Sequence, residues 1–199
     1  MRISSKQLLP IALTAACCLP AGALAESNSD NTGPTYSASA RLNLQVVIPS
    51  FLYFQVGSTG TGTVDTITFS PTAGQLGNSA AISGTGGNAS SGSGADVVIR
   101  GNGGQITISE SNNGGGQGLD AGGNKHISLT EIGVDDSANA SLPAPTLSDT
   151  GGNTSQPVLN GGASQVTNQS STWVYSYNNT TVPEAGTYDI QLTYTASMP

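Results

Sequence analysis

The sequence predicts an all-β protein, an antiparallel sandwich, from three observations. Short segments rich in β-branched and aromatic residues recur along the chain, and several alternate polar with apolar residues. Most of the 27 glycines cluster with serine and asparagine between these segments, where glycine favours loops. No stretch has the period of an amphipathic helix. About eight short strands separated by turn signals are typical of a sandwich.

Residues 1–25 have the features of an export signal. Two basic residues precede a short apolar stretch, and Ala23–Ala25 fits cleavage after small residues. The alternative is attachment of a lipid at Cys17. Cleavage would remove both cysteines, so the mature chain is expected to have no disulfide in a compartment that permits one. The predicted location is the periplasm, the cell surface or the extracellular space.

The longest alternation lies at residues 36–48, after a loose polar tail at 26–35. Its apolar residues all fall on one face of an extended chain, and they are Tyr36, Ala38, Ala40, Leu42, Leu44, Val46 and Ile48. Pro49 interrupts the pattern, because proline cannot donate a ladder hydrogen bond. We expect residues 36–199 to form one β-sandwich domain.

The remaining strands are expected at irregular intervals. They are predicted at 51–56, 63–69, 96–100, 105–109, 126–132, 172–177 and 187–196. Glycine-rich loops are predicted at 83–94 and 111–124, and a longer polar region at 135–171. The last strand places Tyr188, Ile190, Leu192 and Tyr194 on one face, which we expect to pack on the opposite sheet.

The charge of the chain excludes several classes of partner. The predicted mature chain has three cationic residues, Arg41, Arg100 and Lys125, against twelve Asp and Glu residues. Nucleic acids and anionic membranes select basic patches, so neither is expected as a partner. No segment after the signal is long and apolar enough to predict a transmembrane helix.

Candidate catalytic and metal-binding residues are few. His126 is the only histidine, and the chain has no GxSxG motif for a nucleophile elbow. Residues 115–122 match the start of a calcium nonapeptide, once, and Gly122 stands where a large apolar residue is expected. That motif works by stacking of copies, so a loop is favoured. Asp135 and Asp136 could ligate calcium with Asp149 or Asn139, but solvated acids are favoured. We predict no catalytic residues, no metal and no cofactor.

Three aromatic residues share one face of the strand at 172–177. Trp173, Tyr175 and Tyr177 are either part of the core or, if exposed, a platform on which sugar rings stack. The core is the favoured interpretation.

Two stretches together resemble a known family. They are "ARLNLQVVIPSFLYFQVG" at 40–57 and "AGTYDIQLTYTAS" at 185–197. They resemble the secreted domain of the spore coat protein U family, which includes pilins of archaic chaperone–usher systems. The resemblance implies an immunoglobulin-like, pilin-like antiparallel β-sandwich, with a periplasmic chaperone and an usher as partners. The family's cysteine is missing, and Phe51 stands near its place.

In such pilins an N-terminal strand completes the sandwich of the next subunit by β-strand addition. If residues 36–48 are donated in this way, the groove-filling residues are Ala40, Leu42, Leu44, Val46 and Ile48. The acceptor sheet would then contain Tyr188, Ile190, Leu192 and Tyr194. The alternative is that 36–48 is the first strand of a closed sandwich.

The expected function is that of a non-enzymatic, exported surface subunit with a structural or adhesive role. A pilus-like subunit would bind further copies of itself or related subunits. The alternative is a self-contained secreted β-sandwich that binds a ligand such as a glycan.

Overall fold

The strands of the computed structural model group into three sheets, and the structure describes residues 27–60, 62–161 and 165–199. The strands and the two 3₁₀ turns are, in chain order, β1 (Leu52–Val56), β2 (Ile67–Thr68), β3 (Ile82–Ser83), β4 (Thr85–Gly87), β5 (Ser93–Gly101), β6 (Thr107–Asn112), β7 (Leu119–Asp120), β8 (His126–Ile127), η1 (Leu129–Glu131), β9 (Ile132–Asp135), η2 (Ser137–Asn139), β10 (Thr154–Ser155), β11 (Thr167–Tyr177) and β12 (Leu192–Ser197).

The largest sheet is built on β5 and β11, the two longest strands among the described residues. They pair antiparallel from Gly101 opposite Thr167 to Gly94 opposite Val174. The other edge of β5 pairs with β1 antiparallel and, near the start of β5, with β4 in parallel. The last residues of β11 pair with β3 on one edge and β9 on the other, and β2 extends the sheet from β4.

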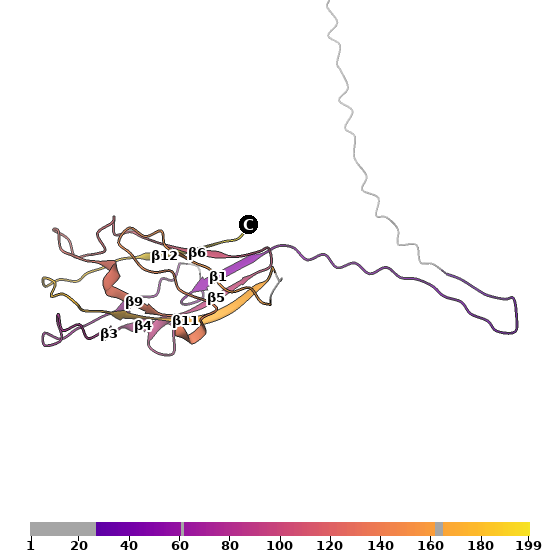
Figure 1. The fold of residues 1–199 in the computed structure, drawn as a ribbon, viewed down its shortest axis with the longest axis horizontal. Helices are drawn as coiled ribbons and strands as arrows, with labels where there is room; N and C mark the ends of the chain where they lie inside the picture. The colour runs from indigo at the N-terminus through magenta and orange to yellow at the C-terminus, as the bar shows by residue number, and fades with distance from the viewer. Residues whose placement is uncertain (1–26, 61, 162–164) are drawn as a thin grey trace, which may run out of the picture. The chain divides into compact units, whose positions relative to one another are not determined.

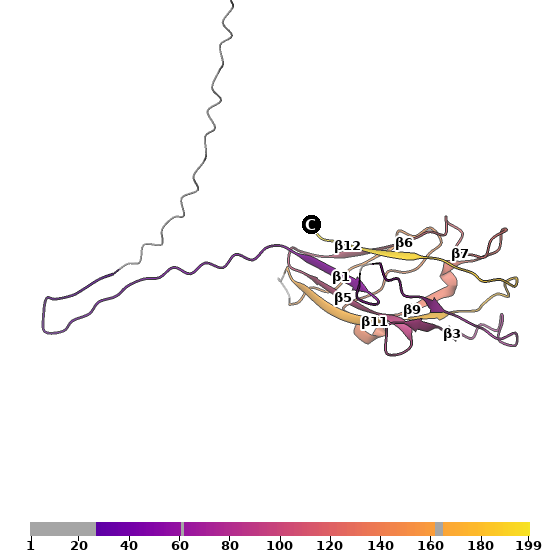
Figure 2. The same ribbon diagram turned by 180° about the vertical axis from the view of Figure 1, so that it is seen from behind.

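A smaller antiparallel sheet forms the second layer, in the order β10-β6-β12. In Figures 1 and 2, β6 and β12 run along one side of the domain, and β5, β11 and β9 along the other. One hydrophobic core joins the layers and includes Ile108 of β6, Ile99 of β5 and Trp173 of β11. The predicted all-β class is therefore confirmed, with predominantly antiparallel pairing.

Several predicted strands are shorter than their sequence patterns suggest. The strand predicted at 126–132 is divided by η1, where the Ser128 hydroxyl accepts a hydrogen bond from the Thr130 N–H. Of the segment 63–69, only Ile67–Thr68 is a strand. The last strand begins at Leu192 instead of Thr187, and before it Asp189 makes a single bridge to Asp120.

The prediction of a continuous loop at 83–94 is wrong. The end of β3, the whole of β4 and the start of β5 lie within it. A Cβ atom added at Gly94 would lie 2.6 Å from the Trp173 carbonyl oxygen, so glycine there permits a close backbone approach within a sheet. The predicted loop at 111–124 likewise contains the end of β6 and all of β7, and the region 135–171 contains β10 and the start of β11.

The chain divides into two units, Met1–Ile48 and Pro49–Pro199. The strands belong to the second unit, which begins at Pro49, whereas the sequence predicted a domain starting at residue 36. None of residues 27–48 is assigned to a strand. The predicted export signal, its cleavage site and Cys17 lie outside the described residues. Within the described residues, no helix has the length and hydropathy needed to cross a bilayer.

Candidate functional site

The segment 36–48 presents its apolar side chains to solvent. The exposed fractions are 79% for Leu42, 87% for Leu44, 84% for Val46 and 75% for Ile48, and Ala40 is also exposed. Scattered single apolar residues are normal on a protein surface, but a contiguous apolar row marks an interaction site. These four aliphatic residues occupy alternate positions, so in an extended chain they form one such row.

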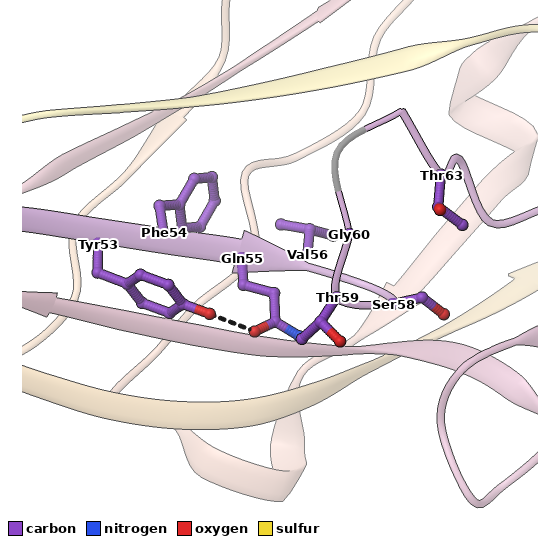
Figure 3. A pocket seen from close by; sticks show the side chains of 8 residues that line it. All are labelled: Tyr53, Phe54, Gln55, Val56, Ser58, Thr59, Gly60 and Thr63. Atoms are coloured by element: carbon purple, nitrogen blue, oxygen red, sulfur yellow. Dashed lines mark hydrogen bonds between the residues drawn. The ribbon is translucent and has the colours of Figure 1, made fainter.

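One edge of β1 carries no strand partner among the described residues. The other edge is occupied by β5, from Leu52 opposite Gly101 to Val56 opposite Val97. A hollow of about 440 Å³ is lined by the four consecutive residues Tyr53–Val56 and by the loop that follows β1. Consecutive strand residues point to opposite faces, as Tyr53 and Phe54 do in Figure 3. A hollow that meets all four therefore lies along the edge of β1, beside its backbone.

The edge of β12 away from β6 also has no strand partner among the described residues. β1 and β12 belong to different sheets and approach each other, and both views place β1 between β5 and β12. At one end of this pair, the Phe51 carbonyl oxygen and the Met198 sulfur both lie against Gly101. The two open edges thus border the same margin of the domain.

The side chains along this margin are apolar and only partly covered. Phe54 and Val56 of β1, and Leu192, Tyr194 and Ala196 of β12, pack against the core while remaining partly exposed. Neither β1 (LYFQV) nor β12 (LTYTAS) contains a charged residue. Natural sheets usually protect open edges with charges or proline, and an edge without them accepts another strand.

The four predicted acceptor residues occupy two different settings. Leu192 and Tyr194 lie in β12, as part of the partly exposed margin. Tyr188 and Ile190 precede the strand, where Tyr188 donates a hydrogen bond to the Glu184 carbonyl oxygen. Ile190 packs against the core. The structure therefore places Leu192 and Tyr194 at the margin and gives Tyr188 and Ile190 no position in the sheet.

The platform interpretation of the β11 aromatic residues is wrong. Trp173, Tyr175 and Tyr177 are buried. The Trp173 indole N–H donates to the Leu142 carbonyl oxygen at 3.1 Å, and its ring meets Tyr194 edge-on at 5.3 Å. These side chains belong to the core, the alternative that the sequence favoured. The glycan-binding hypothesis loses its proposed platform.

Two tyrosine hydroxyls meet inside the domain, 3.1 Å apart, from Tyr175 of β11 and Tyr194 of β12. Burial raises the pKa of Tyr194, and the neighbouring Tyr175 hydroxyl raises it further. Burial also raises the pKa of Tyr175, partly offset by its hydrogen bond with Tyr194. The folded domain therefore disfavours the ionised form of both hydroxyls.

Because of this pair of tyrosines, we expect the free energy of unfolding to fall at alkaline pH. Both folded pKa values lie above the unfolded value of about 10, so the stabilisation is complete below pH 10 and declines as the pH rises above it. The slope is at most about 1.4 kcal/mol per pH unit for each tyrosine. Urea unfolding between pH 8 and pH 11 should show this decline. The variant Y175F/Y194F should reduce it, with a remainder from Tyr177, whose pKa burial also raises. Y36F, which changes an exposed tyrosine, should leave it unchanged.

The candidate catalytic and metal-binding residues do not assemble into a site. The His126 Nδ1 lies 3.5 Å from the Asp120 Oδ1 and has no hydrogen-bond partner. The carboxylates of Asp135, Asp136 and Asp149 each accept a hydrogen bond from a backbone N–H group, that of Ser137, Ala144 and Leu129 respectively. Among the described residues, no group of three His, Cys, Asp or Glu side chains could hold a metal ion.

The candidate site residues that the sequence prediction did not identify are those of β1. The pattern of residues 51–56 predicted a strand. The sequence did not indicate which edge of that strand would lack a partner. That depends on where β5 and β12 lie, which is a property of the topology. The lack of charge in LYFQV is the one local signal that could have pointed to this edge.

Comparison of the chain with protein-family models, curated proteins and solved structures gives no match. The function must therefore be argued from the site itself.

Proposed function

We propose that the protein is a non-enzymatic, exported surface subunit that assembles with further copies of itself by β-strand addition. Residues 36–48 of one copy occupy the margin between β1 and β12 of the next copy. Export rests on the pattern of residues 1–25, and the immunoglobulin-like form of the sandwich rests on the resemblance to pilin-like domains. From the same resemblance we propose a periplasmic chaperone and an usher as assembly partners.

The observation that supports the proposal is the complementarity between the segment 36–48 and the margin. The segment has an exposed row of apolar side chains and no assigned strand. The margin has two uncharged edges without strand partners and a hollow along one of them. In β-strand addition, backbone hydrogen bonds give affinity and alternate side chains fill pockets.

Burial of the aliphatic side chains of the segment favours association. Burying an aliphatic side chain of this size contributes about 1.5–3 kcal/mol. Leu42, Leu44, Val46 and Ile48 together contribute on the order of 6–12 kcal/mol before the cost of ordering the segment. The added backbone hydrogen bonds increase this further.

The test is the mass of the purified protein, produced by expressing the complete chain. Light scattering on the eluate of a sizing column should show a ladder of subunit multiples that survives moderate denaturant. A single monomeric mass with one cooperative melt would overturn the proposal in favour of a self-contained binding module.

A matched pair of variants tests which face of the segment carries the assembly. L42E/L44E places two carboxylates on the apolar row and should abolish the multimers, because burying an unpaired charge is costly. N43E/Q45E adds the same charges on the opposite face of the same segment and should retain them. Loss of the multimers in both variants would show that net charge alone matters, and their retention in both would show that the apolar row is not needed. Either result would contradict the proposed mode of assembly.

A further inference from the structure

The turn between β5 and β6 holds the backbone just before β1. The Asn102 side-chain amide donates from Nδ2 to the Pro49 carbonyl oxygen at 2.9 Å. Its Oδ1 accepts the Phe51 N–H, also at 2.9 Å. Backbone pairing of β1 with β5 ends at Leu52 opposite Gly101. Beyond this point the Asn102 side chain, in place of the β5 backbone, makes the hydrogen bonds to the chain that leads into β1.

These two hydrogen bonds fix the conformation of Ser50. In an extended chain the C=O of one residue and the N–H two residues later point to the same side, as in a β-ladder. The two hydrogen bonds of the single Asn102 side-chain amide fit that arrangement. Asn102 therefore holds Pro49–Phe51 extended, in continuation of β1.

The turn that carries Asn102 is itself anchored on both sides. The Gly103 N–H contacts the Met198 sulfur at 3.1 Å, and the Gly104 N–H donates to the Gln165 carbonyl oxygen at 3.2 Å. A Cβ atom at Gly103 would lie 2.9 Å from the Ser50 hydroxyl and 2.7 Å from the Met198 methyl group. The close packing leaves Asn102 little freedom to follow a displaced Pro49.

This arrangement affects whether the segment 36–48 can reach the margin of its own copy or only that of another copy. For Val46 and Ile48 to lie along their own β1, the chain would have to reverse at 49–51, as a tight hairpin loop does. An extended Pro49–Phe51 cannot form that reversal. Breaking both hydrogen bonds is required first.

We propose that Asn102 is a positioning residue that prevents self-closure and directs residues 36–48 to a second copy of the chain. This inference rests on the proposed function. Two hydrogen bonds of ordinary net strength shift the ratio of self-closed to donated segments by roughly 5- to 150-fold.

The test compares N102A with the wild type at equal concentration on a sizing column with light scattering. The ratio of monomer to multimers should rise roughly 5- to 150-fold in N102A. The control is N168A, because Asn168 is an exposed asparagine of β11. It should leave the distribution unchanged.

An N102A monomer could arise from self-closure or from a weakened fold. Trypsin cleavage after Arg41, which lies inside the segment, distinguishes the two. The N102A monomer should resist cleavage there, because its segment is paired with its own margin. A monomer cleaved rapidly at Arg41 would overturn the inference, since its segment would be neither donated nor self-closed.

The failures of the two proposals are distinguishable. If the wild type forms multimers and N102A has the same distribution, the inference on Asn102 is wrong and the proposed function stands. A wild type that is monomeric overturns the proposed function and the inference with it.

Discussion

Replacing Trp173 with alanine is expected to lower the free energy of unfolding by about 3–5 kcal/mol, the usual cost of removing a large aromatic side chain from a core. Trp173 is fully buried at the centre of β11, opposite Ala95 of β5. The variant loses the edge-on contact with Tyr194 of the other sheet. It also leaves the buried Leu142 carbonyl oxygen without the indole N–H that it accepts.

The measurement is urea unfolding followed by circular dichroism, at one protein concentration because assembly would make the midpoint concentration-dependent. V158A is the control, since Val158 is about half exposed and should change the unfolding free energy by less than about 0.5 kcal/mol. A W173A variant with an unchanged midpoint would contradict the packing of the two sheets on this ring.

The strand content followed from local sequence, because the strongest strand signals are local. The segments 96–100 and 172–177 are β-branched or aromatic with alternate burial, and they lie in β5 and β11, the pair at the centre of the largest sheet. The choice between core and platform for Trp173 also favoured the core for a sound reason, since a row of aromatic residues in a β protein most often fills the interior.

Glycine misled the prediction where backbones approach closely. A glycine-rich stretch such as 83–94 indicates a loop when read by propensity alone. Here Gly94 lies between two strands at a distance that no side chain would allow. The sequence cannot distinguish a glycine needed for backbone flexibility from one needed for close backbone approach, because the residue is the same in both cases.

The candidate site was only half accessible to sequence reasoning. The alternation at 36–48 identified the apolar row, and the structure exposes that row. The receiving margin depends on β1 and β12 lying side by side with open edges, and their pairing partners β5 and β6 are distant in sequence. The role of Asn102 was hidden for the same reason, since its partners Pro49 and Phe51 are about fifty residues away.

Replacing Asn179 with alanine is expected to cost about 2–4 kcal/mol of unfolding free energy. Asn179 is fully buried just after β11. Its Nδ2 donates to the Gln75 carbonyl oxygen at 2.6 Å, and its Oδ1 accepts the Gly77 N–H at 3.0 Å. It therefore ties the loop before β3 to the end of β11, where those two strands pair. The Asn179 Nδ2 also donates to the Asn78 Oδ1 at 3.1 Å. Alanine removes all three bonds and leaves the loop groups unsatisfied inside the protein.

The backbone of Asn179 adds a second contribution that a set of variants can separate. Its φ of 56° is left-handed, a conformation that asparagine tolerates and alanine disfavours by about 1 kcal/mol or more. N179G loses the side-chain bonds but not the conformation, so it should be less destabilised than N179A by about that amount. N124A shares the left-handed backbone, with a φ of 69° at an exposed residue, and should show the conformational cost alone. If N179A proved no more destabilised than N124A in urea unfolding, the buried hydrogen bonds would not hold the loop to β11.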